Sequence, residues 1–171
     1  MRWSGRPKGQ PVLPKIVSFL NRLAIALSSG VLLGMMLLAC SNMILRFFGF
    51  PVMGTFELMG FGGAIIASLA LGGTQEKKGH IEVNLIEQVL PTGCNLFIRL
   101  VSLCMAAGLF CLMAWRLLLL AGILHSSGEV SETLHLDYSF VVVLVALGVG
   151  LLIATLLAQI LQLLKEGKDA P

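Results

Sequence analysis

Residues 57–91 read ELMGFGGAIIASLALGGTQEKKGHIEVNLIEQVLP, and this stretch decides the fold. It opens with an acid, Glu57, at the head of an apolar run long enough to cross a membrane. The run ends at two basic residues, Lys77 and Lys78, and a short amphipathic segment follows as far as Pro91. The stretch therefore predicts a membrane span that is joined to a helix lying along the membrane surface.

The rest of the chain has the composition of a membrane protein. Of its 171 residues, 57% are hydrophobic and 12% are charged, and a soluble domain carries about twice that share of charge. With three further apolar runs, we predict an all-α integral membrane protein with four transmembrane helices in one membrane domain, residues 23–164. A basic segment, residues 1–22, precedes this domain, and a polar tail, residues 165–171, follows it. The spans are expected at residues 23–45, 54–75, 96–124 and 138–164.

The first apolar run resembles the start of a signal peptide, because basic residues precede it. Its length, residues 23–45, exceeds the roughly 7–15 residues of a signal-peptide apolar core. We therefore expect it to remain in the mature protein as the first transmembrane helix.

The positions of Lys and Arg predict the orientation. Ten of the twelve lie in the N-terminal segment, around the connection between the second and third spans, or in the tail. The other two, Arg46 and Arg116, lie toward the opposite side. Both termini and the amphipathic segment are therefore expected in the cytoplasm, and the acidic connection between the third and fourth spans is expected outside.

The amphipathic segment is predicted to be a helix at about residues 80–90. On a helical wheel Ile81, Leu85 and Val89 share one side, and polar residues occupy the opposite arc. The alternation of residues 81–85 also suits a strand, but it fails at Ile86. A segment of about ten residues is too short to span a bilayer. It is expected either to lie in the cytoplasmic interface or to serve as a helical connector.

Small residues recur at intervals of four along the spans, a pattern that permits close packing of membrane helices. The stripes predict helix contacts, either within the chain or with another protein. The second span contributes Gly60, Ala64, Ser68 and Gly72, the fourth contributes Ala146, Gly150, Ala154 and Ala158, and the first contributes Ala26, Gly30 and Gly34.

Two charged residues, Glu57 and Arg116, are placed by their spacing from Lys77 and Arg99 near the outer interface, at similar depth. An ion pair between them would lower the cost of each charge in lipid. Two single-residue interpretations compete with the pair. Glu57 suits the N-terminus of a helix, where the dipole favours an acid, and Arg116 can extend along the helix to reach water.

The sequence offers few residues for catalysis or cofactor binding. The histidines, His80, His125 and His135, do not fall at matching depth inside the bundle, as a bis-histidine haem requires. No acid lies at the midpoint of a span, where coupled transport pathways usually place one. The cysteines form no Cys-x-x-Cys pair and are expected to be small buried hydrophobes: Cys40, Cys94, Cys104 and Cys111. We therefore predict no enzymatic activity, no cofactor and no metal site.

Several short motifs resemble a known family. The sequence TQEKKGHIEVNLI at residues 74–86 is similar to the most recognisable motif of the small membrane subunit of tripartite ATP-independent periplasmic (TRAP) transporters, the DctQ-like family. Three other stretches agree with it: Glu57-Leu58, Ala114-Trp115-Arg116, and residues 127–134. The sequence departs from the family at Asn84, where Asp is common, and at Glu132 and Asp137, where prolines are common.

The resemblance implies a scaffolding role in a bacterial or archaeal inner membrane. A small subunit of this kind binds a large multi-span subunit that moves an organic acid together with an ion. A periplasmic binding protein delivers the substrate. The motif residues expected at the partner interface are Lys78, Gly79, His80, Ile81 and Asn84. His80 is expected to shape the turn between the second span and the surface helix.

Two other functions remain open from the residues alone. One is an autonomous four-helix exporter that uses Glu57 as its coupling acid. The other is a membrane anchor for a redox complex.

Overall fold

The computed structural model describes residues 15–78 and 92–166, which form four long helices. They are α1 (Lys15–Phe47), α2 (Thr55–Lys78), α4 (Thr92–Ser127) and α5 (Tyr138–Glu166). Each helix contains a stretch long and apolar enough to cross a membrane. Within the two described ranges the only extended pairing is an isolated antiparallel bridge between Val130 and Asp137. The predicted all-α class with four membrane helices is confirmed, whereas the amphipathic helix expected at 80–90 lies outside the described residues.

The helices are longer than the apolar spans that the sequence predicts. α1 begins at Lys15, directly after Pro14, so residues 15–22 of the expected N-terminal segment form its first two turns. Its 33 residues reach about 50 Å, whereas the hydrocarbon core of a bilayer is about 30 Å thick. A helix satisfies its own backbone hydrogen bonds, so it can continue beyond the apolar run into the polar interface.

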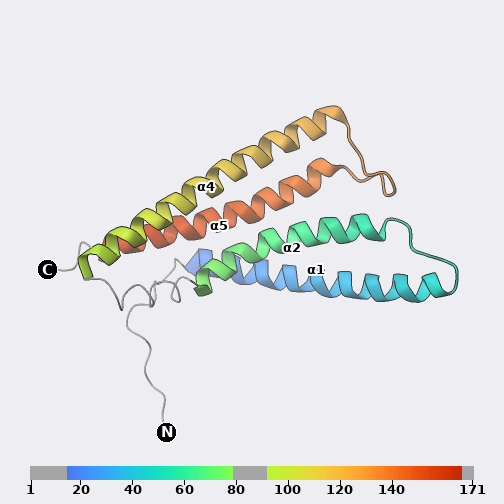
Figure 1. The fold of residues 1–171 in the computed structure, drawn as a ribbon, viewed down its shortest axis with the longest axis horizontal. Helices are drawn as coiled ribbons and strands as arrows, with labels where there is room; N and C mark the ends of the chain where they lie inside the picture. The colour runs from blue at the N-terminus through green and yellow to red at the C-terminus, as the bar shows by residue number, and fades with distance from the viewer. Residues whose placement is uncertain (1–14, 79–91, 167–171) are drawn as a thin grey trace, which may run out of the picture.

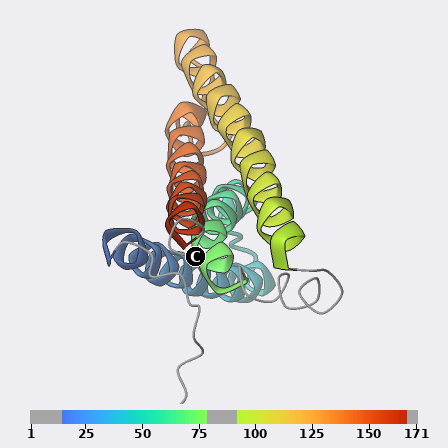
Figure 2. The same ribbon diagram turned by 90° about the vertical axis from the view of Figure 1, so that its left-hand side faces the viewer.

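The helices pack in the order α1, α2, α5, α4, so that α2 and α5 form the centre of the bundle (Figures 1 and 2). α1 packs mainly on α2, and α4 packs mainly on α5. The ends of the helices define two ends of the bundle. At the loop end lie the connections 48–54 and 128–137, and at the terminal end lie Lys15, Lys78, Thr92 and Glu166 (Figure 1).

The core lies where α2, α4 and α5 meet. Ala107 of α4 and Leu152 and Leu156 of α5 are its buried centre, and Leu71 of α2 packs against them with Phe110. In α5, 33% of the most apolar window is buried inside the bundle, against 6% in α4. α5 is therefore the central helix, and α4 is a peripheral one.

Glycine allows α2 and α5 to approach closely. A Cβ atom on Gly148 would lie 2.7 Å from the carbonyl carbon of Ser68, which is backbone and cannot rotate away. At Gly72 a Cβ would lie 2.7 Å from Oδ1 of Asn21 on α1. These two positions fix how near α2 sits to its neighbours on either side.

The small-residue stripes are only partly used inside the chain. In α2, Ser68 and Gly72 are buried, whereas Gly60 and Ala64 are exposed. In α5 the two ends of the stripe, Ala146 and Ala158, are buried, and its middle residues, Gly150 and Ala154, are exposed. In α1 all three stripe residues are exposed. The contact face of α1 is formed instead by three other residues, Asn21, Ala24 and Ser28.

Candidate functional site

At the loop end, Glu57 ties the start of α2 to the connection between α4 and α5. Its carboxylate accepts a hydrogen bond from the hydroxyl of Ser131, a side chain with no exposed surface. It also accepts bonds from the backbone N–H and the hydroxyl of Thr133, at 3.1 and 2.9 Å, and from the N–H of Leu134 at 3.3 Å. One acid in the first turn of α2 thus accepts four hydrogen bonds from three residues of a loop more than seventy residues away.

The connection between α4 and α5 also folds on itself. The N–H of Ser131 donates to the carbonyl of Leu136 at 2.9 Å, and the N–H of His135 donates to the carbonyl of Ser131 at 3.0 Å. His135 adopts a positive φ of 51° to close this turn. Leu134 rests on Gly54, where a Cβ would overlap its side chain. The loop therefore presents its donors to Glu57 in a fixed arrangement.

Glu57 and Arg116 do not form the ion pair that their spacing suggested. The relative depth of α2 and α4 follows from their contacts with the start of α5. The rings of Phe61 and Tyr138 pack edge to face with centroids 5.5 Å apart, and the hydroxyl of Ser139 donates to the carbonyl of Ala121. Phe61 and Ala121 thus lie at about the same depth.

From that common depth the two charged residues lie in opposite directions. Glu57 lies four residues from Phe61 toward the loop end, about 6 Å, and Arg116 lies five residues from Ala121 toward the terminal end, about 7.5 Å. The two side chains are therefore separated by about 13 Å along the bundle axis. Counting from Lys77 and Arg99 failed to reveal this separation, because it treated these two residues as lying at the same depth.

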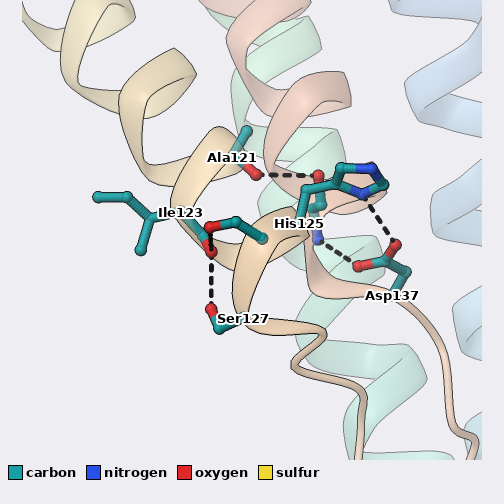
Figure 3. A network of polar contacts seen from close by, with 7 residues as sticks. Ala121, Ile123, His125, Ser127 and Asp137 are labelled. Atoms are coloured by element: carbon teal, nitrogen blue, oxygen red, sulfur yellow. Dashed lines mark hydrogen bonds and ion pairs between the residues drawn. The ribbon is translucent and has the colours of Figure 1, made fainter.

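Asp137 directly precedes α5 and joins it to the end of α4 (Figure 3). Its Oδ1 accepts a bond from the N–H of Ser139 at 3.3 Å, the geometry of a helix N-cap. Its Oδ2 lies 3.7 Å from Nδ1 of His125, an exposed pair. Asp137 thus caps the helix that follows.

The connection between α1 and α2 is held by side chains as well. Oδ1 of Asn42 accepts a bond from the N–H of Val52 at 2.9 Å, and the hydroxyl of Thr55 donates to the carbonyl of Val52 at 2.7 Å. The loop end is therefore organised by short polar contacts within and between its two connections.

At the terminal end, Asn21 connects three helices. Its Nδ2 donates to Oε2 of Glu76 on α2 at 3.0 Å and to the hydroxyl oxygen of Thr155 on α5 at 3.2 Å. Asn21 and Thr155 have no exposed surface. One helical turn farther along α5, Gln159 accepts a bond from Gln75 at 3.4 Å. We call the set formed by Asn21, Glu76 and Thr155 the asparagine cluster.

Sequence reasoning missed the asparagine cluster. Asn21 was assigned to the polar N-terminal segment, and Thr155 was overlooked within an apolar run. The available signal was an amide on α1 and a hydroxyl on α5 at the depth where these helices meet, since polar side chains inside membranes usually bond across helices.

The remaining predicted interface residues are placed only in part. Lys78 is the last residue of α2, and Gly79, His80, Ile81 and Asn84 lie outside the described residues. Arg116 is exposed on α4.

A groove of about 650 Å³ opens between α1, α2 and the start of α5. Its walls are apolar, and Asp137 is the charged residue among those that line it. Among the described residues, no group of three or more His, Cys, Asp or Glu side chains is placed to hold a metal ion. The groove is suited to apolar groups. At each end of the bundle, the polar side chains described above bond to other groups at that same end.

Comparison with known proteins identifies a family. The family model described as tripartite ATP-independent periplasmic transporters, DctQ component, matches residues 35–166. The chain matches none of the curated proteins and none of the solved structures with which it was compared. The matched range begins in α1 and includes α2, α4 and α5 to its last residue.

Proposed function

The chain belongs to the DctQ component family of tripartite ATP-independent periplasmic transporters, and from this premise we propose that it braces the large transport subunit during ion-coupled uptake of an organic acid. Membership makes it a small membrane subunit of a transporter, a class that is not enzymatic. The match over most of the membrane region is the observation that carries the proposal.

The distribution of polar groups supports a bracing role. Asn21, Glu57 and Thr155 bond to other groups of the same chain, so these groups serve to hold helices and loops together. The groove between α1, α2 and α5 is apolar, and an organic anion is bound by positively charged or N–H groups. A bundle built in this way supplies a rigid apolar surface, which is what a scaffold needs.

We further propose that both termini face the cytoplasm. The terminal end of the bundle carries Lys15, Arg22 and Arg99, and the loop end carries Arg46 and the acids Glu129 and Glu132. This asymmetry supports the orientation that the Lys and Arg distribution predicts. In this orientation the loop held by Glu57 faces the periplasmic binding protein.

Lys78, Gly79, His80, Ile81 and Asn84 remain candidates for contact with the large subunit at the cytoplasmic surface. The resemblance to the family motif supports this assignment. Replacing His80 with alanine is expected to weaken assembly or uptake, and unchanged assembly together with unchanged uptake would refute the assignment.

The proposed function is tested by isolating the full-length chain from its native membrane with an affinity tag. A multi-span membrane protein is expected to co-purify in constant proportion. Reconstituted vesicles should take up a labelled C4-dicarboxylate or sialic acid only when the large subunit, the binding protein and this chain are all present. Uptake by this chain alone would contradict a scaffolding role.

A further inference from the structure

α4 has one face that packs on α5 and another that meets nothing in the chain. Its buried residues are Ala107 and Ala121. At 100° per residue, Arg116 lies about 180° around the helix from Ala107 and about 140° from Ala121. The guanidinium therefore projects away from the bundle.

The residues around Arg116 form a continuous exposed stripe, which we call the outward face of α4. All its members lie within about 40° of Arg116 on the helical wheel. Its apolar members are large and between 62% and 72% exposed. The outward face consists of Met105, Leu109, Leu112, Arg116 and Ile123.

Arg116 is a charge within a membrane-spanning segment, Ile98–Ser127. In the part of the chain that the structure describes, the single ion pair is that of His125 with Asp137, so Arg116 has no carboxylate beside it. Glu57, the acid once expected to pair with it, is held by Ser131, Thr133 and Leu134. An arginine in this position is costly unless its guanidinium reaches water or an anion from outside the chain.

The direction of the side chain favours a protein carboxylate over a lipid phosphate. Arg116 lies 11 residues from the end of α4 at Ser127 and 24 from its start at Thr92, so the nearer membrane surface is at the loop end. Side chains on a helix lean toward its N-terminus, which for Arg116 is toward the middle of the membrane. Reaching a phosphate at the loop end requires about 16 Å along the helix against this lean.

We propose that the outward face of α4 docks a transmembrane helix of the large subunit, and that an Asp or Glu on that helix pairs with Arg116. This inference rests on the proposed function, which supplies the partner. A planar guanidinium binds a carboxylate through two parallel hydrogen bonds. The apolar residues above and below Arg116 pack on the partner helix and exclude lipid headgroups and water from the pair.

The test compares four full-length variants, each tagged and co-expressed with the large subunit. The ratio of large subunit to tagged chain is measured after extraction in a mild detergent. Arg116→Leu is expected to lower the ratio about tenfold or more, because it leaves the partner's acid unpaired in the membrane. Arg116→Lys keeps the charge but cannot form two parallel hydrogen bonds with a carboxylate. Its ratio of large subunit to tagged chain should lie between those of Arg116→Leu and the wild type.

Two further variants make the result specific to this face. Arg46→Leu removes an exposed arginine from the last turn of α1, and it should leave the ratio unchanged. Leu112→Glu places an acid one turn before Arg116, where it can pair within α4 and compete with the partner. It should lower the ratio of large subunit to tagged chain. In this variant Arg116 still has a carboxylate beside it, so the arginine is not left unpaired in the membrane. A lower ratio for Leu112→Glu would therefore report the loss of the contact with the partner and not a misfolded chain.

The partner's acid is found by combining Arg116→Glu with Lys substitutions of each membrane-embedded Asp or Glu of the large subunit. Restored co-purification at one position identifies the pair. A wild-type ratio for Arg116→Leu, or loss of bound phospholipid from that variant with the large subunit still present, overturns the inference. If the wild-type chain itself retains no large subunit, it is the proposed function that fails.

Discussion

α5 and α4 pack side by side, but they use their surfaces in opposite ways. α5 is the more apolar of the two, with a mean hydropathy of 3.0 in its best window against 2.1 for α4, and it is also the more buried. Its inward side carries Gly148, Thr155 and Gln159. Among the described residues, the fully buried ones of α4 are two alanines, Ala107 and Ala121, beside which Phe110 is partly buried, and Arg116 is exposed.

The comparison shows what holds a membrane bundle together. Lipid is as apolar as leucine, so hydrophobicity alone gives two helices little reason to associate. The faces in contact are therefore marked by small residues, which permit close approach, and by polar groups, which bond across the interface. A face of large exposed hydrophobes, such as that of α4, is instead available to lipid or to a partner.

The largest loss of stability is expected when a side chain is added at the closest contact between α5 and α2. Gly148→Leu should destabilise the isolated chain by about 3 kcal/mol, because the new side chain meets the backbone of Ser68. Gly150→Leu, two residues away on the open side of α5, should change stability by no more than about 0.5 kcal/mol. Unfolding in mixed detergent micelles, followed by circular dichroism, measures both. Equal effects would show that α5 has no preferred inward side.

Two leucines, one buried on α5 and one exposed on α4, test whether the two helices differ in how much their packing contributes to stability. Leu156 of α5 is 1% exposed and Leu112 of α4 is 67% exposed. Leu156→Ala should cost about 2 kcal/mol, at the low end for a buried leucine, because lipid supplies no hydrophobic transfer term and only packing is lost. Leu112→Ala should leave the same unfolding curve unchanged for the chain alone. A clear loss with Leu112→Ala would mean that α4 packs inside the bundle on that face.

The asparagine cluster should contribute less than the close contact at Gly148. Asn21→Leu removes the donor that joins Glu76 and Thr155, and it should cost about 1 kcal/mol, the typical value for a hydrogen bond between membrane helices. Ser29→Ala is the control, since that hydroxyl is exposed and bonds only the carbonyl of Ile25 in its own helix. If Thr155→Val adds a full further loss to Asn21→Leu, the two side chains act independently and the cluster is not a unit.

The smallest effect on unfolding is expected at the loop that joins α4 to α5. Glu57→Gln keeps one carbonyl oxygen but removes the charge that accepts bonds from the loop. The amides of Thr133 and Leu134 should then exchange with deuterium several-fold faster, as measured by nuclear magnetic resonance in micelles. Glu132→Gln, an exposed acid in the same loop, should not change those rates. If the amides of Thr133 and Leu134 exchange as slowly in Glu57→Gln as in the wild type, the loop keeps its conformation without Glu57.

The sequence predicted the four membrane helices because twenty or so consecutive apolar residues have few other stable arrangements. It also identified Glu57 and the stretch 127–134 as motifs, without indicating that they meet. Their contact depends on how far α2 and the connection before α5 project from the bundle, and spacing along one helix does not contain that information. The same limitation left the pairing of Glu57 with Arg116 open, and the structure shows no ion pair between them.

The sequence by itself determined the class of protein, the number of spans and the family, because these depend on local composition and on short motifs. Only the tertiary structure decided which side of each helix is buried. A helix rich in Gly and Ala, such as α5, offers small residues on several sides, and the choice between Gly148 and Gly150 depends on the angles at which the four helices cross. The structure likewise turned Arg116 away from Glu57 and away from the bundle, because α4 buries Ala107 and Ala121 and leaves the opposite side open.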